Sequence, residues 1–209
     1  TGVQVFAGHQ TVARLQFLPA ARTLPEVEPE TIPEHPLFAG DGGSGPAPIG
    51  QCADARVLSE VVVPKKITVH LARPAVSAAN VTVSFQDYIA NVASSEVYPT
   101  WPEQALRANI LAQISLALNR IWTEWYPSRG YSFNITGSPG YDQAYVNGRT
   151  VFAVMERLTA ELFNTFVQRS GDAEPYFTEY CDGKTVTCPG MKQWGTVDRA
   201  RELSLIHIS

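Results

Sequence analysis

The sequence predicts an α+β fold, in which a small antiparallel sheet packs with a few long helices, preceded by a Pro-rich linker and a truncated β fragment. Two segments, 67–71 and 81–85, alternate apolar and polar residues, which is typical of half-buried strands. Three segments that follow repeat apolar residues every three or four positions, which indicates helices. These elements define one domain over residues 61–200.

Residues 1–60 lack these patterns. Val3–Phe6 and Val12–Leu18 are short strand-like runs, so we interpret residues 1–18 as the truncated β fragment. Prolines recur between positions 19 and 48, and Asp41–Gly45 is rich in glycine. Because no regular element persists through such a composition, residues 19–60 are interpreted as a linker.

The two predicted strands open the domain and are joined by a loop over 72–80. His70 alternates with the apolar positions of its strand, so we expect it on the solvent face rather than as a ligand.

The first helix is expected from Phe85 to about Tyr98, since Pro99 follows. The second begins at Pro102, and its apolar stripe reaches Trp125.

A third helix is expected from Arg149 to Arg169, with Gly171 ending it. The stretch 176–180 then predicts a strand, and 190–195 predicts a glycine-bounded loop that carries Trp194.

Composition excludes several classes of function. The chain has 16 Lys+Arg against 20 Asp+Glu and a formal charge of -4, so nucleic acid is disfavoured as a partner. No apolar run approaches the roughly 20 residues of a membrane helix. The sequence has no phosphate-binding glycine loop, no His-Glu-x-x-His helix and no Gly-x-Ser-x-Gly elbow.

Three cysteines are too few for a disulfide scaffold, and their spacing does not suit a zinc knuckle. Cys181 and Cys188 bracket a short loop and can form a disulfide in an oxidising compartment, which would leave Cys52 unpaired. Two reduced cysteines are the alternative. We expect no metal and no cofactor.

The two ends of the chain suggest a missing N-terminal segment and a foreign C-terminal one. The sequence begins at Thr1, so it leaves open whether a secretion signal precedes it. Residues 203–209 (LSLIHIS) resemble a translated sequencing adapter, and we interpret them as an artefact. A short terminal strand is the alternative.

Glu96 is the strongest candidate for chemistry. It stands at the end of the first predicted helix, ahead of a Tyr-Pro-Thr-Trp-Pro turn. The negative pole of the helix and desolvation both disfavour the ionised carboxyl, and both raise its pKa toward that of a general acid. A solvated residue at a helix end is the alternative.

Four segments resemble the stage II sporulation protein D family, also called SpoIID/LytB. They are FQDYIANVASSE at 85–96, WPEQALRANILAQ at 101–113, DQAY at 142–145 and GMKQWG at 190–195, which is similar to the family's closing Gly-Met-Ser-Gln-Trp-Gly motif. In order, they span about residues 61–200.

The resemblance implies a function on bacterial peptidoglycan outside the membrane. Some members are lytic transglycosylases that act on glycan strands stripped of peptides, and others enhance a cell-wall amidase. Glu96 occupies the place of the family's catalytic glutamate. Tyr141 and Asp142 occupy the places of a His-Cys pair that belongs to a metal site, so we expect that site to be absent. Asp142 either takes over the polar role of the histidine or caps a turn.

Other residues are candidates for binding a glycan. Aromatic rings stack on sugar faces, and amides bond sugar hydroxyls. As ordinary alternatives, the same rings can belong to the core and the amides to loops. The candidates are Tyr98, Trp101, Tyr141 and Trp194 as platforms and Asp142, Gln143 and Gln193 as polar contacts.

The sequence therefore predicts a glycan-acting, extracytoplasmic domain, a candidate lytic transglycosylase. The rival is a non-catalytic module of the same fold that binds peptidoglycan and stimulates a hydrolase such as an amidase. Retention of Glu96 favours the enzyme, and loss of the His-Cys pair favours the rival. An intracellular structural protein is a third alternative.

Overall fold

The computed structural model describes residues 11–13 and 61–206, with side chains from 61 to 203. The expected strand at 3–6, most of the one at 12–18 and the linker at 19–60 lie outside the described residues. The elements are β1 (Thr11–Ala13), β2 (Lys66–His70), β3 (Asn80–Ser84), α1 (Phe85–Glu96), α2 (Glu103–Trp122), the 3-10 helix η1 (Pro127–Arg129), β4 (Ile135–Thr136), α3 (Ala153–Leu162), β5 (Thr165–Val167), β6 (Tyr180–Cys181), β7 (Met191–Lys192) and α4 (Gln193–Ile206).

The fold is α+β, as predicted, but its sheet is mixed rather than antiparallel. β2 pairs antiparallel with β3 over its full length. On its other edge β2 pairs parallel with β4, because the chain returns to the sheet only after α1 and α2. Two further parallel pairs, β1–β5 and β6–β7, lie outside this sheet.

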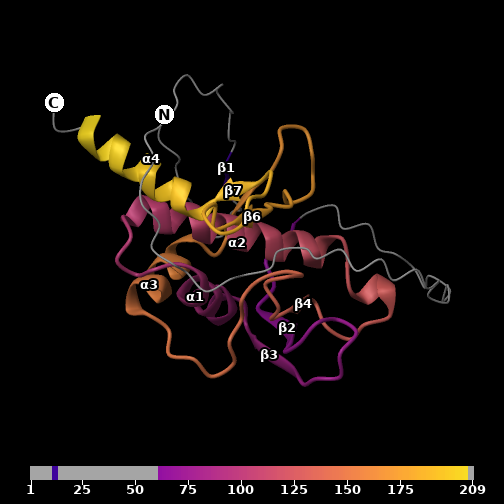
Figure 1. The fold of residues 1–209 in the computed structure, drawn as a ribbon. Coiled ribbons are helices and arrows are strands. Elements are labelled where there is room, and N and C mark those ends of the chain that lie inside the picture. Colours follow the sequence, from indigo (N-terminus) through magenta and orange to yellow (C-terminus); the bar gives the residue numbers. More distant parts are fainter. Residues whose placement is uncertain (1–10, 14–60, 207–209) are drawn as a thin grey trace.

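α2 is the central element of the domain. Figure 1 shows it running through the middle of the molecule, with α1 and α3 on one side and α4 on the other, and it contacts all three helices and β5. Its buried residues include polar ones that hold loops. The Ser115 hydroxyl accepts a hydrogen bond from the Val167 N–H, and the Asn119 amide donates to the Pro175 carbonyl.

α1 follows directly from β3, as the change in periodicity predicts. The side chain of Ser84 caps the helix by accepting a hydrogen bond from the Asp87 N–H. The buried face includes Phe85, Tyr88 and Ile89. Apolar burial of this face fixes the direction in which the last residue of the helix points.

The third predicted helix is too long at both ends. α3 covers only Ala153–Leu162, and Thr165–Val167 forms β5 instead of ending a helix at Gly171. Thr165 and Val167 are β-branched, which favours a strand, and β5 obtains its hydrogen bonds from β1 and α2. The partners of β5 are distant in the sequence, so the local spacing of apolar residues could not predict this strand.

Two single-residue expectations are also wrong. Trp125 lies beyond the end of α2, and its ring stacks with the guanidinium groups of Arg120 and Arg129. His70 is buried rather than solvent-facing, because its ring stacks on Phe133 at 4.6 Å and bonds the side chain of Asn80.

The C-terminal part differs from its predicted elements. The strand expected at 176–180 is confined to Tyr180–Cys181, and the loop expected at 190–195 consists of β7 and the start of α4. Residues 203–206 belong to α4 rather than to the terminal strand considered above, and 207–209 lie outside the described residues.

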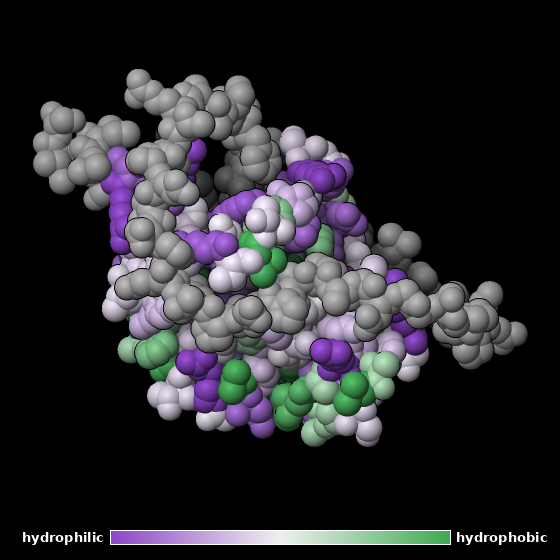
Figure 2. All heavy atoms as spheres, viewed as in Figure 1, coloured by the Kyte–Doolittle hydropathy of each residue, from purple (hydrophilic) through white to green (hydrophobic). Residues whose placement is uncertain are grey.

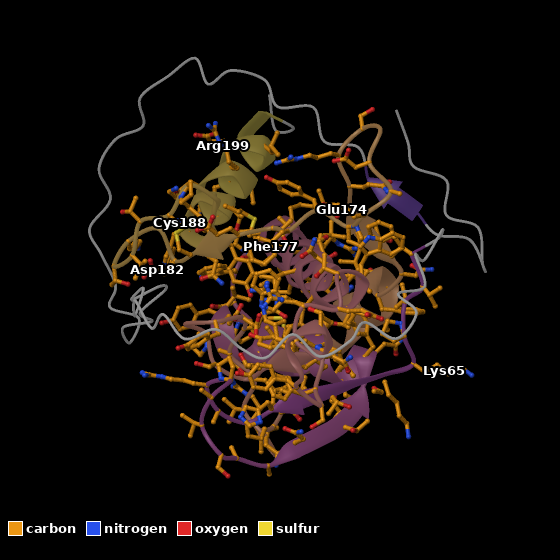
Figure 3. The ribbon with its side chains drawn as sticks, turned by 90° about the vertical axis from the view of Figure 1, so that its right-hand side faces the viewer. Lys65, Glu174, Phe177, Asp182, Cys188 and Arg199 are labelled. Atoms are coloured by element: carbon orange, nitrogen blue, oxygen red, sulfur yellow. A yellow bond between two sulfur atoms is a disulfide. The ribbon has the colours of Figure 1, made fainter. Side chains whose placement is uncertain are left out.

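Cys181 and Cys188 form the disulfide considered above, with their Cα atoms 6.1 Å apart. Figure 3 shows Cys188 and Asp182 on the same loop at the edge of the domain. Close to this loop, a Cβ at Gly190 would lie 1.9 Å from the carbonyl oxygen of Glu179. The backbone just before β7 therefore approaches the backbone just before β6 too closely for a side chain at position 190.

We expect replacement of both Cys181 and Cys188 by Ser to lower the free energy of unfolding by about 2.5 kcal/mol, since the bridge closes a loop of about eight residues in the unfolded chain. Urea denaturation measures this loss. A reductant should destabilise the native chain by a similar amount and leave the double variant unchanged. An equal response of both proteins to reductant would contradict the prediction.

Candidate functional site

Glu96 is the last residue of α1, and its side chain turns into the interior. Only 9% of the residue is exposed. The helix ends here because Val97 is extended and Pro99 disfavours helix in the residue before it. The carboxyl group therefore lies at the negative pole of α1, where the helix does not stabilise its charge.

Three donors from distant parts of the chain hold this carboxylate. The backbone N–H of Ala144 donates to Oε1 at 2.8 Å. The Gln113 amide and the Tyr180 hydroxyl donate to Oε2 at 2.9 and 2.7 Å. These bonds replace the water that the group loses on burial.

Burial raises the pKa of Glu96 above its usual value, and the three donors oppose this effect only in part. Burial also raises the pKa of Tyr180 well above that of a free tyrosine, with the charge of Glu96 adding to the effect. Tyr180 therefore keeps its proton and acts as a donor. A carboxyl group with a raised pKa beside fixed donors can both give and take a proton.

Gln143 is not the exposed sugar contact that the sequence suggests. It is fully buried, and its Nε2 donates to the Tyr180 hydroxyl and to the backbone carbonyl of Gln113, both at 3.1 Å. Its Oε1 accepts from the Tyr88 hydroxyl. Gln143 therefore supports the partners of Glu96 instead of reaching a ligand.

Asp142 is likewise committed to the fold. Its fully buried side chain forms an ion pair with Arg120 at 2.7 Å and accepts bonds from the Tyr126 hydroxyl and from Thr136. It corresponds to the capping alternative more closely than to a substrate contact. Tyr141 is exposed, and its ring does not belong to the cluster that the other candidate platforms form.

These other three aromatic candidates pack together. Trp101 and Trp194 have ring centroids 4.8 Å apart, and Tyr98 lies about 6 Å from both. Trp101 is buried, whereas 40% of Tyr98 is exposed. The ammonium group of Lys184 lies 3.6 Å from the centroid of the Trp194 ring. The cluster joins the turn after α1 to the first turn of α4.

A pocket of about 20 Å³ adjoins Glu96. This volume holds about one water molecule. A sugar ring therefore fits only if some of the residues that line the pocket move. The lining residues are Glu96, Pro139, Asp142, Tyr180, Cys181, Asp182 and Gln193. Gln193, predicted as a polar contact, is itself buried and belongs to this lining.

Two side chains that donate to Glu96, those of Gln113 and Tyr180, are not among the candidates predicted from the sequence. Gln113 lies three residues after Ile110 and seven after Leu106, so a polar residue within the apolar stripe of α2 was an available signal. No local pattern marks Tyr180, which reaches Glu96 only because β6 lies beside the end of α1.

A larger groove of about 910 Å³ lies elsewhere on the domain. Its apolar lining includes Ala108 and Leu111 of α2 together with Phe177 and Met191. Its charged lining consists of Arg169, Asp172, Glu174 and Glu179. In Figure 3, Phe177 lies near the centre of the view and Glu174 lies farther out, toward a loop at the edge of the domain. Figure 2 shows polar and apolar side chains interspersed on the face that it views, where they are not grey.

The comparisons give no relative: no family model, no curated protein and no solved structure matches the chain. Within the described residues, no three His, Cys, Asp or Glu side chains are grouped as metal ligands. Of the helices in that part of the chain, none combines the length and hydropathy needed to cross a membrane.

We expect Glu96→Gln to gain stability relative to the native chain as pH rises. Because the folded pKa of Glu96 is raised, the native state holds this proton more tightly than the unfolded state does. The native chain is therefore most stabilised by this group below about pH 4.5, and it loses that contribution as pH rises through the folded pKa. Each tenfold difference in proton affinity between the two states corresponds to a loss of about 1.4 kcal/mol.

Urea denaturation of both proteins between pH 4 and 8 measures this difference. The matched control is Glu156→Gln, since Glu156 is exposed on α3. The effect of burial is the pH dependence that Glu96→Gln shows beyond that of this control. A constant difference for Glu96→Gln would show that the carboxyl group is not perturbed in the folded chain.

Proposed function

We propose that this domain acts on the glycan strands of bacterial peptidoglycan as a lytic transglycosylase, with Glu96 as general acid and base. The observation that carries the proposal is the buried Glu96 carboxyl, whose pKa is raised while three donors fix its position. The resemblance to the SpoIID/LytB family in four segments, one of which contains Glu96, supports the choice of substrate.

Glu96 takes part in both halves of the reaction. The protonated carboxyl transfers its proton to the glycosidic oxygen as the bond from that oxygen to C1 breaks, which leaves an oxocarbenium-like sugar. The 6-hydroxyl of the same sugar then attacks C1 and loses its proton to the Glu96 carboxylate. The products are a chain with a new free hydroxyl and a 1,6-anhydro end, and no water is consumed.

The surroundings of Glu96 suit these two roles. Burial favours the protonated acid before cleavage. After proton transfer, the donors from Ala144, Gln113 and Tyr180 stabilise the carboxylate without reorganisation of the backbone. The exposed ring of Tyr98, in contact with Trp194, provides a face on which a sugar can stack.

An extracytoplasmic location belongs to the same proposal. The disulfide between Cys181 and Cys188 adjoins the pocket at Glu96, since Cys181 lines it. Disulfides persist in oxidising compartments, and peptidoglycan lies in such a compartment. We therefore propose that the domain works in the cell wall.

The rival function, a non-catalytic module that stimulates a cell-wall amidase or another hydrolase, is favoured by the groove of about 910 Å³. Its volume exceeds that of the pocket at Glu96 by more than tenfold. A largely apolar lining with three carboxylates and one arginine, Arg169, suits a protein segment that has an apolar side chain and basic neighbours.

We expect Glu96→Gln to abolish cleavage of denuded glycan strands, with a loss of at least about 100-fold, because the amide cannot donate and recover a proton. Mass spectrometry of anhydro-muramyl ends measures cleavage, and sedimentation with the glycan measures binding. Binding should stay within about twofold of the native value, since stacking on Tyr98 and Trp194 does not need that proton.

Glu156→Gln is again the matched control and should cleave as the native chain does. Absence of cleavage by the native chain, with equal glycan binding by both proteins, would refute the enzyme and favour the rival. An equal loss of binding and cleavage in Glu96→Gln would show that Glu96 holds the ligand rather than transferring a proton.

The rival makes its own prediction at the groove. Ala108→Arg places a long basic side chain in the groove, and it should abolish stimulation of an amidase while leaving glycan binding unchanged. Gln104→Arg introduces the same side chain on the exposed face of α2 and is the control. Stimulation that survives Ala108→Arg would exclude the groove as the contact.

A further inference from the structure

Gln113 differs from the other partners of Glu96 in what its side chain can do. It is fully buried on α2, and its Nε2 donates to Oε2 of Glu96 at 2.9 Å. Its own Oε1 is buried and has no hydrogen-bond partner among the described residues. Thus the amide pairs one of its two polar ends with the carboxylate and leaves the other unused.

The proposed reaction requires Glu96 to be protonated in one step and ionised in the next. A carboxylate accepts hydrogen bonds, whereas a carboxylic acid also donates one. The backbone N–H of Ala144 is a donor in both steps. In the protein without substrate, a partner that accepts the acid proton must therefore be found among the side chains.

Tyr180 is not free to become that acceptor, because its hydroxyl is oriented by Gln143. The Gln143 Nε2 is fixed as a donor by the backbone carbonyl of Gln113, and it also donates to the Tyr180 oxygen. The Tyr88 hydroxyl occupies the Gln143 Oε1. With its oxygen accepting from Gln143, Tyr180 directs its own proton to Glu96.

From these contacts, and resting on the proposed function, we infer that Gln113 is a positioning residue whose amide reverses when Glu96 changes protonation state. With Glu96 ionised, Nε2 donates to the carboxylate. With Glu96 protonated and no substrate bound, the amide turns over and Oε1 accepts the proton carried on Oε2. One covalent change occurs, the loss or gain of the proton on Glu96.

The reversal is feasible because each state leaves one polar group of the Gln113 amide unpaired, either Oε1 or the NH₂ group. In the ionised state the carbonyl oxygen of Gln113 is unpaired within the described part of the chain. In the protonated state its NH₂ group occupies that place. A fixed N–H donor at this position would face the acid proton of Glu96 whenever Glu96 is protonated. The amide avoids this contact, because it presents Oε1 to the acid proton and Nε2 to the carboxylate oxygen.

NMR on the full chain tests this inference without any substrate. The pH is varied while the Glu96 side-chain carboxyl carbon and the Gln113 side-chain NH₂ group are followed. We expect the Gln113 signals to move with the same midpoint as the Glu96 carbon, because the charge-assisted bond from Nε2 is lost on protonation. The through-space contacts of the Gln113 NH₂ protons with the Glu96 side chain should also be lost at that midpoint, because the reversal turns the NH₂ group away from the carboxyl group. In Glu96→Gln the Gln113 signals should not change over this range.

Two results would overturn the inference. If Glu96 titrates while the Gln113 signals stay fixed, the acid proton faces the pocket rather than Gln113. If the Gln113 signals titrate equally in Glu96→Gln, another group controls them. Failure of the proposed function is recognised separately, because coupled titration in a chain that cleaves no glycan would support the amide reversal and refute the enzyme.

Discussion

The cost of burying one carboxyl group organises this domain. Glu96 leaves water at the end of α1, and hydrogen bonds from α2, from the segment after β4 and from β6 replace that water. None of these segments is near Glu96 in the sequence, so their convergence depends on the packing of α1 against α2. The donors offset the desolvation only in part, so the pKa of the carboxyl group stays above its usual value.

Local pattern was sufficient for the elements that carry this arrangement. The periods of β2, β3 and α1 could be read directly from the apolar residues on one face of each element. α2 is buried on more than one side, and it could be read from its long run of apolar residues at helical spacing. β5 was misread as helix because Phe166 fits a helical spacing, although its partners lie in β1 and α2. The position of Glu96 could be predicted from the proline turn that follows it, but Tyr180 could not be predicted, since only tertiary structure brings it there.

The neighbours Asp142 and Gln143 show why residue type alone misleads. Both are polar and both belong to the DQAY segment at 142–145, so the sequence suggests ligand contacts. In the structure the carboxylate of Asp142 pairs with Arg120, while Gln143 sets the direction of the Tyr180 hydroxyl. Buried polar groups must be paired, and in this segment that requirement determines the role of each residue.

The parallel pair β6–β7 separates the two cavities of the domain. Glu179 and Met191 line the groove, whereas Tyr180, Cys181 and Gln193 line the pocket at Glu96. Successive residues of one short backbone thus serve opposite sides, and Gly190 leaves no room for a side chain between them. A substitution that moves the β6–β7 backbone therefore changes the shape of the groove and of the pocket at Glu96 together. Neither cavity can readily be reshaped alone at this place.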